Sequence, residues 1–465
     1  MIATFIVLLP LAAAALCVIS RTARWSAALA SAAVCGAAVW SLFAPAGSLR
    51  LVWAAPLGAS YAVDVDALSA FFVVAIGSVS LVGALASARV ADRRAYFALW
   101  CIALSGLCGV IVSRDLALLF ASWESTIIAL AILVRQWGGG SRGTAAQAFV
   151  AYTLVGSGLF IVALASIAIA RGTLDMDALA ARPIGAAGQL LPAMLFLAAF
   201  APALPLFPVH GWVARVYVAA PIPVTMLIGA GLGSAAFYGV IRCCLALFPQ
   251  GMAAAAPVLV AVSTVGALYG ALLATRQEDL RRLIAYLALS QQSLVALAVF
   301  AATLTSLRGA VIASLANALV IAALLLMATW LGQRSSSFLI AHMGGIAATA
   351  PGLAAFSTLI VLAAIGVPGS AGFAGDLLVL VGTYERYPAP AIAAAVAGVI
   401  LAAAGARFCR RALHGPPLIV ATEIRWREWL LVVPLLALVI GLGVAPRAVI
   451  DRVGDGLLPA AERRQ

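Results

Sequence analysis

Apolar runs of about 20 residues recur along almost the whole chain, and they limit its fold more than any other feature. A run of this length crosses a bilayer as one α-helix. Hydrophobic residues make up 65% of the 465 residues and charged residues only 9%, whereas a soluble domain carries about 25% charged residues. The chain lacks the polar residues needed to cover a water-facing surface. We therefore predict an all-α polytopic membrane protein.

The apolar runs predict about fourteen transmembrane helices. Their ranges are 1–19, 25–44, 66–87, 95–113, 116–134, 145–170, 187–208, 219–246, 252–275, 283–304, 309–332, 350–382, 390–407 and 429–446. We divide them into an N-terminal part (1–94), two repeats (95–246 and 252–407), and a C-terminal part (408–465) with a loop, the last helix and a tail.

The basic residues indicate how the chain is oriented. All 28 are arginine, and 17 of them fall in or beside the loops after odd-numbered helices. The positive-inside rule then predicts that these loops are cytoplasmic and that both termini lie outside a bacterial-type inner membrane. Because the arginines flank apolar runs, they indicate topogenic charge and a lipid-bilayer environment rather than nucleic-acid binding.

Two of the predicted helices should be broken. Pro202, Pro205 and Pro208 interrupt the seventh, and Pro368-Gly369 interrupts the twelfth. Proline removes a helical hydrogen bond, and broken helices at matching places in two halves are typical of inverted-repeat transporters. A spacing of five helices predicts two inverted five-helix repeats with an ion path near the midplane. Ordinary proline kinks are the alternative.

Three titratable residues lie where an ion path would pass. Glu124, inside the fifth helix, is costly in a membrane unless it has a partner or a cavity. We interpret it as a proton-carrying carboxyl, the alternative being an ion pair with Arg114 or Arg135. Asp376 follows the second break as a relay acid or a helix cap. His210 follows the first break as a proton relay or a structural histidine.

No cofactor or metal motif is recognisable. The seven cysteines form no CxxC pair, the three histidines have no metal spacing, and the chain contains no lysine for a Walker motif. Gly229, Gly231 and Gly233 spell GxGxG without a preceding strand, so we predict that they allow close helix packing, as do Gly266 and Gly270.

Several motifs occur in an order that is typical of one family. They are Ser122-Trp123-Glu124, Gln136-Trp137-Gly138-Gly139, Gly156-Ser157, Phe207-Pro208-Val209-His210-Gly211-Trp212, Tyr238-Gly239-Val240-Ile241-Arg242, Glu278-Asp279-Leu280-Arg281-Arg282 and Gly366-Val367-Pro368-Gly369-Ser370-Ala371-Gly372-Phe373-Ala374-Gly375-Asp376. They resemble the antiporter-like membrane subunits of respiratory complex I, the proton-translocating NADH:quinone oxidoreductase. The last motif has the form typical of chain M (subunit 4).

The resemblance implies a proton-translocating subunit without redox centres. Glu124 matches the family glutamate of the fifth helix, and Asp376 matches the acid of the twelfth as a shorter side chain. The positions of family lysines and histidines in the helices between hold other residues, namely Ala148, Ala203, Ser234, Gln291 and Asn317. We predict that Ser234, Gln291 and Asn317 are polar residues of a water path.

The resemblance leaves the particular assembly open. We expect other membrane subunits of a complex I-like machine as partners, and protons as the transported ion. The alternatives are a related complex (a membrane hydrogenase, a cation/proton antiporter or an inorganic-carbon uptake system), a non-pumping scaffold, or a free-standing transporter. If the complex I-like assembly is correct, the chain is a subunit of a translocating NADH:quinone oxidoreductase and has no redox centre of its own.

Overall fold

A computed structural model describes residues 1–44, 47–54, 58–88, 90 and 93–454. The chain divides into two compact units. Residues 1–204 and 219–258, with the segment from 451, form the first, and residues 205–218 and 259–450 form the second. The tail from residue 455, part of the predicted C-terminal region, lies outside the described residues.

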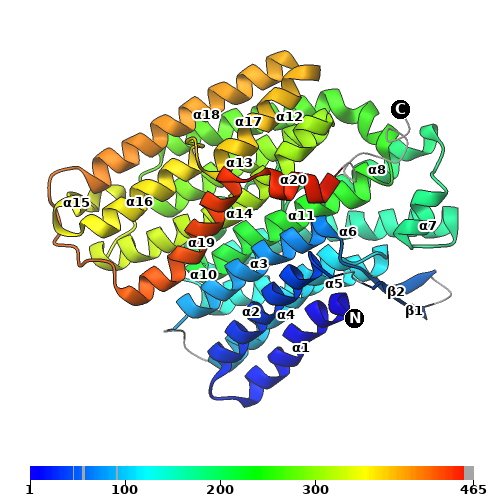
Figure 1. The fold of residues 1–465 in the computed structure, drawn as a ribbon, viewed down its shortest axis with the longest axis horizontal. Helices are drawn as coiled ribbons and strands as arrows, with labels where there is room; N and C mark the ends of the chain where they lie inside the picture. The colour runs from blue at the N-terminus through cyan, green and yellow to red at the C-terminus, as the bar shows by residue number, and fades with distance from the viewer. Residues whose placement is uncertain (45–46, 55–57, 89, 91–92, 455–465) are drawn as a thin grey trace. The chain divides into compact units, whose positions relative to one another are not determined.

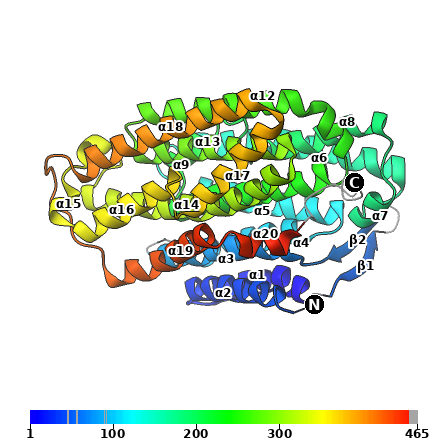
Figure 2. The same cartoon turned by 45° about the horizontal axis from the view of Figure 1, so that its top comes forward.

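The first unit is built from long apolar helices, and α1 to α4 pack side by side within it (Figures 1 and 2). Its elements are α1 Ile2–Ile19, α2 Ala23–Ser41, β1 Leu49–Ala54, β2 Ala59–Val63, α3 Ala67–Ala86, α4 Arg93–Val112, α5 Leu116–Trp137, α6 Arg142–Arg171, α7 Met176–Ala181, α8 Ala186–Phe200, α10 Ile222–Met226, η2 Leu227–Leu232, α11 Gly233–Gly239 and η3 Val240–Leu245.

The strands β1 and β2 depart from the all-α prediction. They form an antiparallel hairpin in which Leu49 pairs with Val63. Both strands lie in the connection between α2 and α3, and with six and five residues they are too short to cross a membrane. Strand pairing satisfies their backbone hydrogen bonds.

The second unit is also helical. Its elements are α9 Val213–Ala219 (whose last residue belongs to the first unit), α12 Pro249–Arg276 (which begins in the first unit), α13 Leu280–Ala301, α14 Leu304–Ser335, η4 Ile340–His342, α15 Ile346–Thr349, α16 Pro351–Ala364, α17 Ala371–Arg386, α18 Pro388–Phe408, η5 Cys409–Leu413, α19 Trp426–Val444 and α20 Arg447–Val453 (which ends in the first unit).

Both predicted helix breaks are present. The helix predicted over 187–208 ends early, because α8 stops at Phe200 and regular helix resumes only at Val213. The helix predicted over 350–382 is divided between Ala364 and Ala371. A single proline is not enough to break a helix in this chain, since Pro192 lies inside α8. The breaks occur where prolines cluster or stand beside glycine, which removes more helical hydrogen bonds than a single proline does.

Eleven helices within the described residues are long and apolar enough to cross a membrane, and α8 and α16 are shorter apolar helices that end at the breaks. Eleven such helices in one chain are what a multi-pass membrane protein has. The total of fourteen crossings stays a prediction.

A main-chain pattern at the start of α5 recurs at the start of α13. Leu116 N donates to Leu174 O and Leu280 N donates to Phe338 O, both at 2.9 Å, so the two pairs are 164 positions apart (280 − 116). Asp115 and Asp279 cap the two helices in the same way. This recurrence supports the prediction of two repeats. Their inverted orientation stays a prediction that follows from the odd number of helices in each.

Glycines allow α17 to pack directly against α14, and the two helices lie side by side (Figures 1 and 2). A Cβ atom added to Gly375 would stand 2.6 Å from Ala313 N, and one added to Gly382 would stand 2.2 Å from Ser306 N. Such backbone contact leaves no room for a side chain. The predicted packing role of Gly266 and Gly270 is confirmed by similar contacts with Ser293 and Ser290.

We expect Gly375→Ala to destabilise the protein by about 1–3 kcal/mol, because its methyl group must push α17 away from α14. The matched control is Gly441→Ala on α19, where nothing lies within 4 Å of the added Cβ. That change should be neutral or slightly stabilising, since alanine favours helix more than glycine does. Thermal unfolding in detergent measures both, and equal midpoints for the two variants would contradict the packing argument.

Candidate functional site

In the first unit, the carboxyl group of Glu124 meets a serine hydroxyl. Glu124 lies on α5 and is half-buried, and its Oε1 accepts a hydrogen bond of 2.5 Å from Ser157 Oγ on α6. Ser157 is only 5% exposed. The partner of this carboxyl is therefore neutral, and it lies on the helix that follows in sequence.

Aromatic rings surround this pair one turn away. Phe120 on α5 and Phe160 on α6 meet edge to face with ring centroids 5.1 Å apart, and Phe160 and Trp123 both contact Phe200 at the end of α8. Apolar ring contacts thus join α5, α6 and α8 one turn away from the carboxyl group.

Glu124 has no ion-pair partner among the residues that the structure describes. Arg114, one of the two candidates, pairs instead with Asp64 at 3.3 Å and Asp66 at 2.9 Å. Asp66 also pairs with Arg242. The alternative interpretation of Glu124 as half of a structural ion pair is therefore wrong for this conformation.

In the second unit, Asp376 lies six residues beyond the N-cap of α17, which is Ser370. It is therefore not a helix cap, and that alternative is wrong. Its Oδ2 accepts a hydrogen bond of 3.4 Å from Gln291 Nε2 on α13, and the same nitrogen donates to Ala364 O at 3.0 Å. Ala364 is the last residue of α16, so Gln291 joins the carboxyl group to the helix break.

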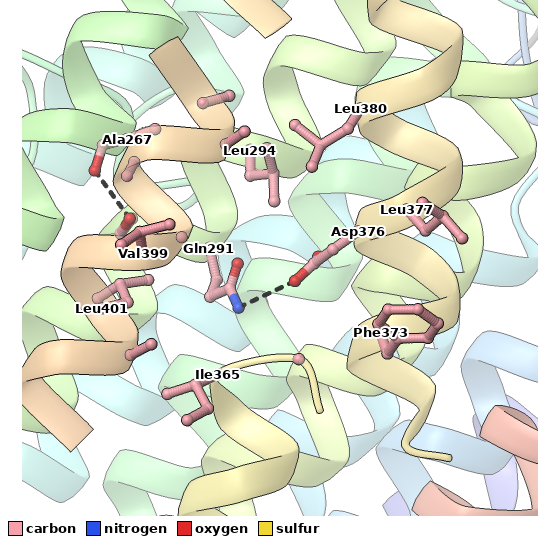
Figure 3. A pocket seen from close by; sticks show the side chains of 17 residues that line it. Ala267, Gln291, Leu294, Ile365, Phe373, Asp376, Leu377, Leu380, Val399 and Leu401 are labelled. Carbon is pink, nitrogen blue, oxygen red and sulfur yellow. Dashed lines mark hydrogen bonds between the residues drawn. The ribbon is translucent and has the colours of Figure 1, made fainter. Parts of the chain in front are cut away.

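A cavity of about 310 Å³ opens at this carboxyl group. Figure 3 shows Gln291 and Asp376 pointing toward each other across it, with Phe373 and Ile365 near the break and Leu401 on the opposite wall. The lining is mainly apolar, with Ser290, Gln291 and Asp376 as its polar side chains. The space is large enough to hold several water molecules beside the acid.

The helix before this break is held by a carboxylate from another segment. Glu423 accepts hydrogen bonds of 2.9 Å from Gly352 N and Leu353 N in the first turn of α16. Glu423 is exposed, and the slight desolvation of its carboxyl group, which opposes ionisation, is outweighed by these amides and Ile424 N, so the pKa of Glu423 is lowered. A carboxylate at a helix N-terminus also interacts favourably with the helix dipole.

Each of the remaining predicted residues has a buried polar atom without a hydrogen-bond partner among the described residues, although the His210 side chain as a whole is only half-buried. The His210 ring stands 5.6 Å from the Phe207 ring and 5.0 Å from the Tyr269 ring, measured between centroids, and its Nδ1 has no hydrogen-bond partner in the described part of the chain. Ser234 Oγ and Asn317 Nδ2 are likewise buried without partners there. Buried polar atoms of this kind normally bind water.

Comparisons with known proteins agree with these features. A family described as the transmembrane part of NADH:quinone oxidoreductases and Mrp antiporters matches residues 113–403. The chain belongs to this family. It is 32% identical to NAD(P)H-quinone oxidoreductase chain 4 2 of Thermosynechococcus vestitus over 82% of this chain and 74% of that one. It is 29% identical to NADH-quinone oxidoreductase subunit M of Pseudomonas aeruginosa over 97% and 96% of the two chains.

Solved structures share the fold of this NADH:quinone oxidoreductase/Mrp antiporter family member. A chain of respiratory complex I from Thermus thermophilus matches with a TM-score of 0.92 and 27% identity over 97% of each chain. A chain of the Mrp complex from Dietzia matches with a TM-score of 0.87 and 20% identity over 98% of this chain and 52% of that one.

Family membership draws attention to the seventh and eighth helices. Ala203 and Ser234 stand at the two positions where the resemblance implies lysine. Ala203 is 3% exposed, and Ser234 is fully buried. Ser234 lies on α11 between two π-helical segments, η2 and η3. Such segments are frequent at functional sites. Gly231 in η2 approaches Leu107 closely, as predicted from GxGxG.

The structure thus places Glu124 and Ser234 in the first unit, and His210, Gln291, Asn317 and Asp376 in the second. Within the second it brings Gln291 and Asp376 into contact. Sequence reasoning missed the contact of Ser157 with Glu124 and the π-helical segments. The Gly156-Ser157 motif was a signal for the first of these, and no sequence signal marked the second.

Proposed function

We propose that this chain is the chain 4 (subunit M) type membrane subunit of a complex I-like NADH:quinone oxidoreductase. In this role it takes part in proton translocation coupled to electron transfer on other subunits. The observation that carries the proposal is the match along 97% of the chain to a complex I chain, combined with an acid in each unit at a family position.

Proton movement in this subunit would be weak or would run by a water path centred on Glu124 and His210. A buried lysine carries protons because desolvation and a nearby carboxylate move its pKa in opposite directions. Alanine at 203 and serine at 234 cannot titrate in this way. Glu124, His210 and Asp376 would then be the proton-exchanging groups, and Ser234, Gln291 and Asn317 would be polar residues of a water path.

The proposed setting is a bacterial-type inner membrane. The relatives are named as oxidoreductase chains, so we expect other membrane subunits of the complex to surround this chain. Both termini would lie outside, and the arginine-rich loops after odd-numbered helices would face the cytoplasm. Electron transfer would take place entirely on partner subunits.

The second candidate is a subunit of a related ion-translocating complex, or a scaffold that no longer pumps. The fold likeness to an Mrp complex chain and the missing lysines favour it. In that case Glu124 and Asp376 would be dispensable for NADH-driven proton uptake.

The experiment is purification of the complex through an affinity tag on this chain in mild detergent. We expect other membrane subunits and NADH:quinone reductase activity to be recovered together with it. Recovery of hydrogenase or antiporter subunits would favour the second candidate. Recovery of this chain alone, active after reconstitution, would contradict both.

A further inference from the structure

The hydrogen bond between Ser157 and Glu124 has a property that an ion pair lacks, because the serine can either donate or accept. Ser157 Oγ has a single proton and two acceptors within reach, namely Glu124 Oε1 at 2.5 Å and Thr153 O at 3.0 Å. It can satisfy only one of them at a time.

The protonation state of Glu124 decides which acceptor is used. When Glu124 is ionised, the Ser157 O–H group donates to the carboxylate. When Glu124 has taken up a proton from water, its own O–H group donates to Ser157 Oγ, and the serine proton turns to Thr153 O. One proton is gained by the carboxyl group, none is lost by the serine, and no covalent bond of the serine changes.

This reversal has a low cost because Thr153 O is an acceptor inside the continuous helix α6. A carbonyl group in a helix interior keeps its hydrogen bond from the main-chain N–H four residues later. The Ser157 hydroxyl can therefore stop donating to Thr153 O without leaving that oxygen unsatisfied. Thr153 itself bonds back to Phe149 O at 2.8 Å and does not compete for the carboxyl group.

We propose that Ser157 is a positioning residue that holds Glu124 in one rotamer in both protonation states. It would thereby take the place of the basic partner that this chain lacks at position 203. This inference rests on the proposed role of Glu124 as a proton carrier. A lysine partner would favour the charged carboxylate, whereas the hydroxyl group serves both forms.

Contacts with α8 and with α5 hold α6 in place on both sides of Ser157. Gly156, next to Ser157, lies so close to α8 that an added Cβ atom would stand 2.7 Å from Ala199 O. On the other side, the Phe120–Phe160 ring contact joins α5 to α6 one turn away. The two helices therefore hold the pair together without a charge.

The test compares Ser157→Ala, Ser157→Thr and the matched control Ser166→Ala in the reconstituted complex. Ser166 lies on the same helix, and within the described part of the chain its hydroxyl donates only to Ala163 O. We expect Ser157→Ala to lower proton translocation per electron roughly tenfold, the effect of losing a hydrogen bond to a charged group. Ser157→Thr, which keeps the hydroxyl, should retain most of the proton translocation of the wild type, and Ser166→Ala should not change it.

Infrared difference spectra give a second measurement that a purely structural role would not change. The C=O stretching band of protonated Glu124 is the one that disappears in Glu124→Gln. In Ser157→Ala this band should move to higher wavenumber, because the carboxyl group loses a hydrogen bond, and in Ser166→Ala it should not move.

The outcomes separate the two proposals. If Glu124→Gln abolishes translocation while Ser157→Ala leaves both the flux and the band unchanged, the role of Ser157 is wrong and that of Glu124 stands. If Glu124→Gln itself has no effect in an assembled complex, the proposed function of the site is wrong. If the Ser157→Ala complex does not assemble, Ser157→Thr is the deciding variant. Its C=O band and its proton flux must both match those of the wild type, and a mismatch in either contradicts the role of Ser157.

Discussion

Replacing Glu124 with glutamine is expected to lower NADH-driven proton translocation through this subunit by about a hundredfold, since a group that transfers protons contributes roughly 10²–10⁴-fold. Glutamine keeps the shape of the side chain and still accepts the Ser157 hydrogen bond, but it cannot bind and release a proton. The measurement is proton uptake per electron in proteoliposomes that contain the complete complex, with NADH oxidation followed in parallel.

The control for this variant is Glu385→Gln, the same chemical change near the end of α17 on an exposed residue. It should leave both coupling and assembly unchanged. Robust coupling in Glu124→Gln with a normal subunit composition would remove Glu124 from the path. The double variant Ala203→Lys, Ser234→Lys adds the missing titratable groups, and it should raise coupling if their absence limits the wild type.

The second large effect is expected at Asp376. Asp376→Asn removes the carboxyl group at the cavity of the second unit, where Gln291 is its hydrogen-bond partner. The asparagine cannot exchange a proton, so we expect a loss of coupled translocation comparable to that of Glu124→Gln. Stopped-flow or dye-based proton uptake in the reconstituted complex provides the measurement.

Asp376→Glu is the matched variant, because it keeps the acid and adds one methylene group that the cavity can hold. It should retain most of the coupling. If Asp376→Asn and Asp376→Glu are equally impaired, the position matters for packing against Gln291 and Phe373 rather than for proton exchange. If neither is impaired, the path does not use this acid.

The sequence alone was enough to predict the membrane helices and the two breaks. A run of apolar residues must leave water wherever it lies, and clustered proline removes helical hydrogen bonds whatever surrounds it. Pro205 and Pro368 therefore marked their breaks within a few residues. Glu124 and Asp376 stood out for a similar local reason, because an acid in an apolar helix requires an explanation.

Only the tertiary structure decided what these acids contact. Ser157 lies 33 residues from Glu124, and Gln291 lies 85 residues from Asp376. Such pairs depend on which faces of two helices meet. Close glycine contacts help to fix the helices that hold one member of each pair, because Gly156 sets α6 against Ala199 of α8 and Gly375 sets α17 against Ala313 of α14. Hydropathy is nearly uniform around these helices, so it determines that they lie in the membrane but not which side chains they bring together.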